Sequence, residues 1–286
     1  MNMMRIAITG GKGGTGKSTI ATSLAAELAK NNRVLLFDAD ADCPNDHIIL
    51  AAKMKRAETV TQMIPEWDTR KCTKCGKCSD VCKLNAIVQI KDSYPIFVPD
   101  QCNGCGACTI ACPTGAIGKS SKDIGYVHEG SNAGVDIISG ELIPNQMLSE
   151  FVVSAAKRLA NKRRHKYDCI ITDTAAGTHC DVISALMGND LAIAVTEPTP
   201  LGAHDLELIM KLLKVLRIPS RIVLNRSDLG DPRLIERISR KYSSEIIARV
   251  PYSRSVLENY SNGIPIENEE IKRLAKWVEK KSGGAE

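Results

Sequence analysis

Eight of the eleven cysteines in this chain lie between positions 72 and 112, in two runs with the same spacing. Each run reads C-x-x-C-x-x-C-x-x-x-C, and the two begin at Cys72 and Cys102. Thiolates are good ligands for iron and zinc, and disulfides are rare in a reducing compartment. The chain starts without an apolar leader, so we expect a cytoplasmic protein in which these thiols bind metal or perform redox chemistry.

The two runs resemble the cysteine pattern of bacterial-type ferredoxins, in which the fourth cysteine of each run binds the other run's cluster. The resemblance implies two 4Fe–4S clusters. One would be held by Cys72, Cys75, Cys78 and Cys112, and the other by Cys102, Cys105, Cys108 and Cys82. Structural zinc is the main alternative, but zinc sites usually pair two separated C-x-x-C units, which leaves the repeated third and fourth cysteines unexplained.

Residues 11–18 form a second chemical pattern, because they match the phosphate-binding sequence G-x-x-x-x-G-K-[ST] between an apolar and a helical stretch. Its glycines let backbone N–H groups point at phosphate oxygens, Lys17 reaches the β- and γ-phosphates, and Ser18 offers a hydroxyl to Mg²⁺. The predicted nucleotide-binding residues of this segment are Gly11, Lys12, Gly13, Gly14, Thr15, Gly16, Lys17, Ser18 and Thr19.

Lys12 is an extra lysine in the loop, and residues 12–18 resemble the deviant Walker A motif of the MinD/ParA/Mrp family of ATPases. In that family the extra lysine reaches the nucleotide of the partner subunit, which implies a homodimer with ATP at its interface. A second cation would stabilise charge on the transferred phosphoryl group. The resemblance therefore implies ATP hydrolysis, with Lys12, Lys17 and Asp40 as catalytic residues and ATP with Mg²⁺ as ligands.

Segments that resemble the same family follow in its usual order. Asp38 and Asp40 resemble its first switch, in which the second aspartate orients the attacking water and the first supports Mg²⁺. Asn45 resembles the switch asparagine, and Asn225 the asparagine that contacts adenine.

Residues 173–177 resemble the second switch of that family. Asp173 would hold a Mg²⁺-bound water, and Gly177 would contact the γ-phosphate. Cys180 follows at the spacing of a bridging-cluster cysteine in the related nitrogenase iron protein. The sequence offers no second cysteine for such a bridge, so we expect an ordinary thiol there.

Short apolar strands alternate with amphipathic helices around these motifs. Strands are expected at 5–9, 34–37, 168–172, 191–196, 220–224 and 246–250, and helices at 17–30, 144–162, 206–216, 233–242 and 271–281. This alternation predicts an α/β fold with a doubly wound and mostly parallel sheet, and the resemblances above imply a P-loop NTPase with an inserted small ferredoxin-like domain. The expected domains are residues 1–62 and 121–286 for the two parts of the ATPase domain, and 63–120 for the insertion.

Composition narrows the possible functions. The chain has 286 residues, a net charge of +5 and 43% hydrophobic residues, which excludes a wholly disordered chain. The sequence contains no run of about 18 apolar residues, so it predicts no membrane span. The basic segment 157–166 is better explained by helix-terminal cations, and the apolar stripe in 271–278 by packing, so neither nucleic acid nor a membrane is an expected partner.

Three interpretations of the protein's function remain open. Our first interpretation is an ATP-dependent dimeric switch coupled to 4Fe–4S clusters for iron–sulfur or metallocofactor assembly. The alternatives are ATP-gated delivery of low-potential electrons to a partner enzyme, and a redox-responsive positioning ATPase without a transfer role. Each of the first two requires a redox or cofactor-acceptor protein that the sequence does not identify.

Overall fold

The computed structural model describes residues 3–254, 258–259, 262–265 and 267–282, and the chain folds into two compact units. The first unit comprises Met1–Glu58, Val127–Glu141 and Ser149–Glu286. The second comprises Thr59–Tyr126 and Leu142–Leu148. The insertion expected at 63–120 falls inside the second unit, which also takes a later segment, 142–148, that the sequence did not indicate.

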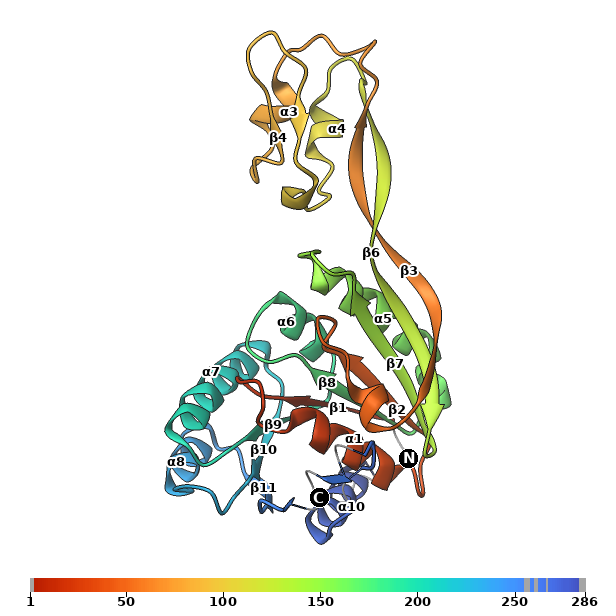
Figure 1. The fold of residues 1–286 in the computed structure, drawn as a ribbon. Coiled ribbons are helices and arrows are strands. Elements are labelled where there is room, and N and C mark those ends of the chain that lie inside the picture. The colour runs from red at the N-terminus through yellow and green to blue at the C-terminus, as the bar shows by residue number, and fades with distance from the viewer. Residues whose placement is uncertain (1–2, 255–257, 260–261, 266, 283–286) are drawn as a thin grey trace. The chain divides into compact units, whose positions relative to one another are not determined.

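The first unit is organised around a sheet with the strand order β11-β10-β9-β1-β8-β2-β7-β6-β3 (Figure 1). From β11 to β7 every neighbouring pair is parallel. These strands are β1 Met4–Thr9, β2 Val34–Ala39, β7 Val135–Leu142, β8 Cys169–Thr174, β9 Leu191–Thr196, β10 Ser220–Asn225 and β11 Ile246–Val250. Every residue of β2, β8 and β9 is buried, as expected for strands covered on both faces.

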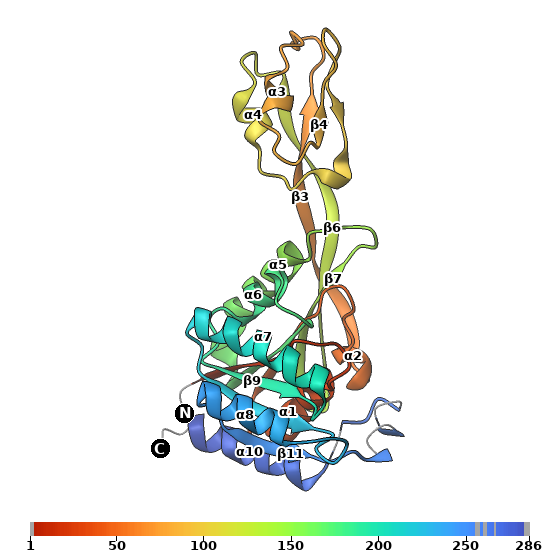
Figure 2. The same cartoon turned by 90° about the vertical axis from the view of Figure 1, so that its left-hand side faces the viewer.

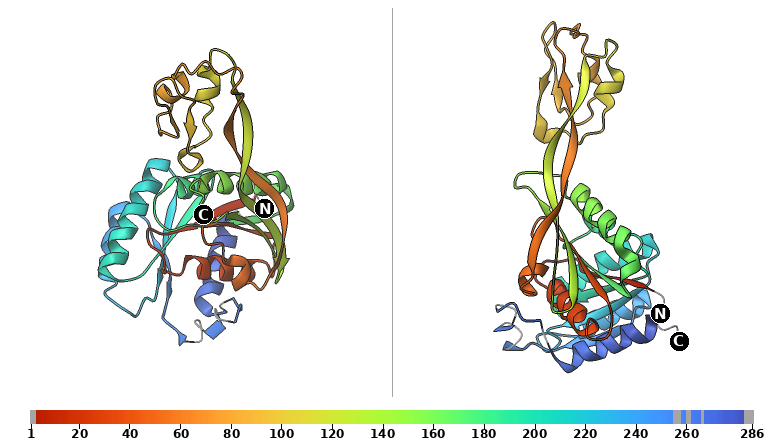
Figure 3. Two further views of the ribbon diagram at one scale, coloured as in Figure 1. Left: turned by 45° about the horizontal axis from the view of Figure 1, so that its top comes forward. Right: turned by 90° about the vertical axis from the view of Figure 1, so that its right-hand side faces the viewer.

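Helices cover both faces of this sheet (Figures 2 and 3). One face carries α1 (Lys17–Leu28) and α10 (Glu269–Ser282), and the other carries α5 (Ser149–Arg163), α6 (Cys180–Leu186), α7 (Pro200–Leu216) and α8 (Arg233–Tyr242). Alternation along β1 explains the two layers, because Ile6 and Ile8 pack with α1 and α10 whereas Ala7 packs with α6, α7 and α8. No helix in the described ranges is long and apolar enough to cross a membrane.

Two long strands, β3 (Lys53–Trp67) and β6 (Ile117–Asn132), lie next to each other in the sheet and were not expected. Much of β3 is exposed, so it lacks the apolar alternation that marks a strand in a sequence. β6 and β7 form a hairpin around Ala133 and Gly134, whose φ angles of 51° and 78° are those of a type I′ turn. Only the short helix α2 (Asp46–Ile49) separates β2 from β3.

The second unit contains the helices α3 (Lys77–Asp80) and α4 (Ala107–Ala111), a 3₁₀ turn at Pro99–Gln101, and a hairpin of β4 (Ile87–Val88) and β5 (Ile96–Phe97). Its backbone repeats at an interval of 30 residues. Left-handed φ angles recur at Lys74 and Gly104, at Gly76 and Gly106, and at Asn85 and Gly115. The repeat seen in the cysteine spacing is therefore also a repeat of conformation.

The helix expected over 144–162 is shorter than predicted, because α5 begins only at Ser149. Asn145 has a left-handed φ of 66°, which an α-helix does not allow, and the backbone N–H of Ile143 donates to the carbonyl of Ile124 at 2.9 Å. Residues 142–148 therefore pack within the second unit before the chain returns to the first.

Candidate functional site

The predicted phosphate loop lies between β1 and α1. Gly14 and Gly16 adopt left-handed φ angles of 81° and 90°, which other residues rarely adopt. A Cβ atom at Gly16 would also collide with the side-chain amide of Asn225. That amide donates to the carbonyl of Thr15 at 2.8 Å, so the end of β10 is tied directly to the loop.

A cavity of about 360 Å³ opens over this loop and contains most of the predicted nucleotide-binding residues. The predicted residues that line it are Gly13, Gly14, Gly16, Lys17, Ser18, Thr19, Asp40, Asn45 and Asn225. The sequence did not indicate Pro251, Tyr252 or Ser253, which also line it. They follow β11, and ligands of open α/β sheets bind beyond the carboxyl ends of the strands, so their position in the chain was an available signal.

Other predicted residues lie near the cavity without lining it. Gly11 packs so closely on α7 that a Cβ atom would collide with the backbone carbonyl of Asp205. Gly177 has a φ of 98°, and its N–H donates to the carbonyl of Gly10 at 3.2 Å. The second switch segment therefore meets the chain where β1 passes into the phosphate loop.

Three carboxyl groups are buried together beside Ser18. They belong to Asp38, Asp46 and Asp173, and Asp46 was not predicted. The carboxylate of Asp38 accepts hydrogen bonds from the backbone N–H groups of Asp40 at 3.1 Å and Asp46 at 3.2 Å. Burial, and then the neighbouring carboxylates, raise the pKa values of Asp38 and Asp46, and burial raises that of Asp173 although a hydrogen bond with Ser18 opposes it.

The oxygens of Asp173 and Ser18 are of the kind that bind Mg²⁺ and its waters, with the other two carboxyl groups close by. Oδ1 of Asp173 and both side-chain oxygens of Asp46 are buried and, apart from the contact between these two carboxyl groups, receive no hydrogen bond from the described residues. Mg²⁺ prefers such hard oxygen ligands and keeps several of its own waters, which donate to nearby carboxylates. Ser18 supplies the hydroxyl that a phosphate loop offers to this ion.

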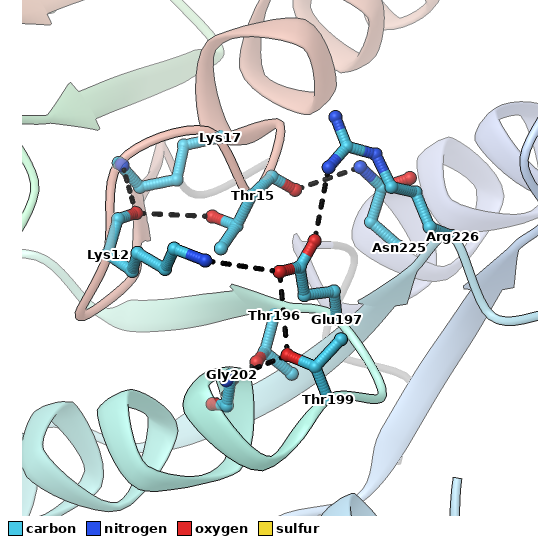
Figure 4. Close-up of polar contacts among 9 residues, drawn as sticks. All are labelled: Lys12, Thr15, Lys17, Thr196, Glu197, Thr199, Gly202, Asn225 and Arg226. Carbon is cyan, nitrogen blue, oxygen red and sulfur yellow. Dashed lines mark hydrogen bonds and ion pairs between the residues drawn. The ribbon is translucent and has the colours of Figure 1, made fainter. Parts of the chain in front are cut away.

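The two loop lysines have different surroundings (Figure 4). Lys17 is buried, and its Nζ donates to the carbonyl of Lys12 at 3.1 Å. Burial lowers the pKa of Lys17, while the charges of Asp173 and Asp40 oppose this shift. Lys12 instead points away, and its Nζ lies 3.4 Å from a carboxylate oxygen of Glu197.

Glu197 connects the phosphate loop with the end of β10. Its second oxygen lies 3.1 Å from the guanidinium of Arg226, which lines the nucleotide cavity (Figure 4). Thr199, close to the first oxygen at 3.5 Å, also caps α7 by accepting the N–H of Gly202 at 3.0 Å. Glu197 therefore holds two cations of the site, and sequence patterns gave no sign of this contact.

The cysteine runs bring one predicted ligand set together. Cys72, Cys75, Cys78 and Cys112 line a single small cavity, although Cys112 comes from the other run. The sulfur of Cys112 accepts the N–H of Ala116 at 3.2 Å. Burial alone would raise the pKa of the Cys112 thiol, but this bond and a hydrogen bond from Thr114 outweigh it and lower the pKa. The lowered pKa favours the thiolate that binds iron.

The second ligand set is less closely assembled. Cys108 is buried against Cys78, and Cys82 packs partly against them. Cys105 is exposed, and the sulfur of Cys102 accepts the N–H of Gly104 at 3.4 Å. In the described residues no three His, Cys, Asp or Glu side chains are placed to hold one metal ion. A 4Fe–4S cluster differs in this respect, because each of its four thiolates binds a separate iron.

The three remaining cysteines take no part in these sets, and all eleven are free thiols. Cys43 and Cys180 are exposed, the latter at the start of α6, and Cys169 is buried in β8. Burial raises the pKa of the Cys169 thiol to about 12, so this thiol is expected to be unreactive.

Comparison with known sequences decides the family. The model of the CobQ/CobB/MinD/ParA nucleotide-binding domain family (CbiA) matches residues 6–266. The chain belongs to this family. Members of its MinD and ParA branches are ATPases, and this chain is an ATPase of the same kind.

Individual relatives agree with this assignment. Two uncharacterized proteins of Methanocaldococcus jannaschii are 32% and 34% identical to the chain, over 91% and 92% of its length and 90% and 89% of theirs. The fold is similar to that of the septum site-determining protein MinD from Pyrococcus horikoshii, solved with Mg-ADP. The TM-score is 0.62, the identity 20%, and 99% of each chain is covered. The α/β fold with its large, mostly parallel sheet is therefore that of MinD-like P-loop NTPases.

Proposed function

We propose that this CobQ/CobB/MinD/ParA-family ATPase works as a homodimeric switch whose second unit holds two 4Fe–4S clusters for iron–sulfur or metallocofactor assembly. The main support is the cavity shared by Cys72, Cys75, Cys78 and Cys112, the ligand set that the ferredoxin pattern implies. In the second run the N–H of the left-handed residue Gly104 donates to the sulfur of Cys102 at 3.4 Å, as backbone N–H groups do toward bound clusters. When bound, the clusters would supply one-electron redox chemistry at low potential.

In the nucleotide site, the chain's own groups have separate roles in the proposal. The N–H groups of the loop and Nζ of Lys17 bind the phosphates of ATP. Asp40, on the cavity wall, orients the attacking water. Ser18, Asp173 and Asp38 would hold Mg²⁺ and its waters, and the bound ion would supply positive charge next to the phosphoryl group.

Dimerisation gives Lys12 its role. In the isolated chain its Nζ contacts Glu197 rather than the cavity beside Lys17. In the proposed dimer, Lys12 leaves Glu197 and reaches the nucleotide of the partner subunit. ATP binding and hydrolysis then move the switch segments around Asp40 and Gly177. α2 follows the first switch and is followed by β3, so this motion has a short chain path toward the second unit.

The first test is anaerobic purification with iron and sulfide analysis and electron paramagnetic resonance after reduction. Two clusters predict about eight irons and eight sulfides per chain, with coupled S = 1/2 signals. Cys78→Ser should lower the iron content, whereas Cys43→Ser, outside both runs, should leave it unchanged. Zinc in place of iron, or equal iron in both variants, would contradict the proposal.

A second experiment separates assembly from electron delivery. The reduced, iron-loaded chain is mixed, with and without ATP, either with an apo-ferredoxin or with an iron-loaded, oxidised ferredoxin, and both the iron and the redox state of the acceptor are followed. Assembly predicts that iron moves to the acceptor and leaves this chain. Electron delivery predicts ATP-dependent reduction of an already loaded acceptor while the iron of this chain stays in place.

A further inference from the structure

The β4–β5 hairpin exposes an apolar face. Val88 and Ile96 are cross-strand partners, and they are 45% and 55% exposed. Extending this register by two residues pairs Ile90 with Tyr94, which are 67% and 47% exposed. Four neighbouring large apolar side chains on so small a unit are typical of a surface that another molecule covers.

The opposite face of the hairpin covers the cysteines. Ile87 is buried beside Cys78 and Cys108, and the ring of Phe97 lies 5.5 Å from that of Trp67. Gln89, which follows β4 and lies between Val88 and Ile90 in the chain, lines the cavity of the first ligand set and donates to the carbonyl of Lys74 at 2.9 Å. The hairpin is therefore the wall between this cavity and the apolar face.

Charge distinguishes the two halves of the repeat. Residues 69–97 contain six Lys or Arg and two Asp, whereas residues 99–127, one repeat later, contain two Lys and two Asp. Lys74 Nζ lies 4.6 Å from the centre of the Tyr94 ring, which places a cation at the edge of the apolar face. Within the described residues Lys74, Lys77 and Lys91 form no ion pair. The positive charge is therefore concentrated in one half of the repeat, where Arg70 and Lys71 pair with Asp68 but Lys74, Lys77 and Lys91 have no acidic partner among the described residues.

We propose that this hairpin face, formed by Val88, Ile90, Tyr94 and Ile96 and flanked by Lys74 and Lys91, docks a small acidic one-electron carrier protein. The inference rests on the proposed function, because it requires iron at the first ligand set. The carrier gives up one electron, and the site of Cys72, Cys75, Cys78 and Cys112 accepts it. No bond is formed or broken, and the carrier is oxidised by one electron.

Charge favours this occupant over a second copy of the chain. A two-fold contact through the hairpin would bring Lys74 and Lys91 close to the same lysines of the other copy. An acidic carrier instead meets these cations with carboxylates around an apolar centre, and opposite charges accelerate the encounter. The same surface would serve either purpose of the proposed function, since reductive assembly and electron delivery both consume electrons.

The test uses the full iron-loaded chain under anaerobic conditions, with oxidised flavodoxin as the acidic carrier. Its dissociation constant is measured by calorimetry at low and at moderate salt, where we expect weakening by about tenfold or more. Lys74→Glu/Lys91→Glu should weaken binding by at least about tenfold and Ile90→Ser by several-fold. Lys119→Glu is the control, an exposed lysine of the same unit in the other half of the repeat, and should change binding by less than about twofold.

The outcomes separate this inference from the proposed function. Iron is assayed in every variant, and a wild-type chain without iron contradicts the proposed function whatever flavodoxin does. A chain with iron whose Lys74→Glu/Lys91→Glu variant binds flavodoxin like Lys119→Glu overturns the docking surface alone. A homodimer that Ile90→Ser dissociates also overturns it, because that result shows that the face is already covered by a second copy of the chain.

Discussion

The two units differ in what holds them together. The first unit packs two extensive apolar layers against a parallel sheet, with side chains from β1 and from the distant helix α10 in the same layer. The described core of the second unit is small, centred on Cys78, Cys108, Ile87 and Ile117. Small domains with little apolar core usually depend on disulfides or metals, and here every cysteine is a free thiol. Only the second unit should therefore depend on what its thiols bind.

The nucleotide site of the first unit and the cysteine site of the second unit also differ in what positions their residues. In the nucleotide site, the loop after β1, the first switch at the end of β2 and Asn225 at the end of β10 are brought together by the carboxyl ends of the parallel strands. In the second unit, the thiols are placed by local turns that recur every 30 residues, with left-handed backbone at Gly76 and Gly106. We therefore expect the first site to be as stable as the large fold that carries it, and the second site, formed by short segments, to depend on a bound group.

Loss of the thiol ligands should have the largest effect. We expect Cys78→Ser to leave the second unit unfolded without iron, because metal binding and folding are coupled in such small units. Limited proteolysis should then cut within 59–126, while the first unit still binds ATP. Cys43→Ser is the matched control and should resist the protease like the wild type. Equal resistance of both variants would show that the two units do not differ in this respect.

Substitution in the nucleotide site should affect chemistry without affecting folding. We expect Asp40→Asn to slow ATP hydrolysis by about 10²-fold or more, because the amide orients the attacking water poorly. ATP affinity should change little, since the loop and Lys17 hold the phosphates. The check is the turnover rate measured beside equilibrium binding of ATP, with Asp42→Asn, an exposed neighbour, as control. A loss of binding equal to the loss of turnover would place Asp40 among the binding groups instead.

The sequence predicted those features that a short local pattern marks and missed those that depend on the packed fold. The strand limits Leu191–Thr196 and Ile246–Val250 were predicted as the structure has them, because buried strands read as short apolar runs. β3 and β6 were missed because exposed polar residues interrupt their pattern. Lys17, Asp40 and Asn225 were found from motifs and line one cavity.

The contacts of Asp46 and Glu197 were not predicted. Asp46 is polar in a short helix after the first switch, and only the packed fold places it beside Asp38 and Asp173. Glu197 lies directly after β9, and its partner Arg226 directly after β10. Adjacent strand ends bring such side chains together, but the order of strands in the sheet is not visible in one sequence.

The buried carboxyl groups predict how stability depends on pH without nucleotide or metal. The pKa values of Asp38, Asp46 and Asp173 are raised by folding, so the folded chain binds protons that the unfolded chain has lost. The free energy of unfolding should therefore fall as pH rises through these raised values, by up to about 1.4 kcal/mol per pH unit for each proton. Asp46→Asn should flatten this slope, measured by urea unfolding in EDTA, and an unchanged slope would mean that Asp46 does not titrate with the others.

The smallest effect concerns Lys12 and Glu197. Glu197→Gln removes the charge that holds Lys12 within its own chain, so dimerisation with ATP should become tighter. A partly exposed ion pair contributes about 0.2–1 kcal/mol, which predicts an increase of up to about fivefold for each of the two subunits. Sedimentation in the Asp40→Asn background keeps ATP intact during the measurement. Arg226→Gln is the control, because it leaves Glu197 free to hold Lys12 and should not tighten the dimer. Equal tightening by both substitutions would show that general charge near the cavity, and not the contact with Lys12, limits dimerisation.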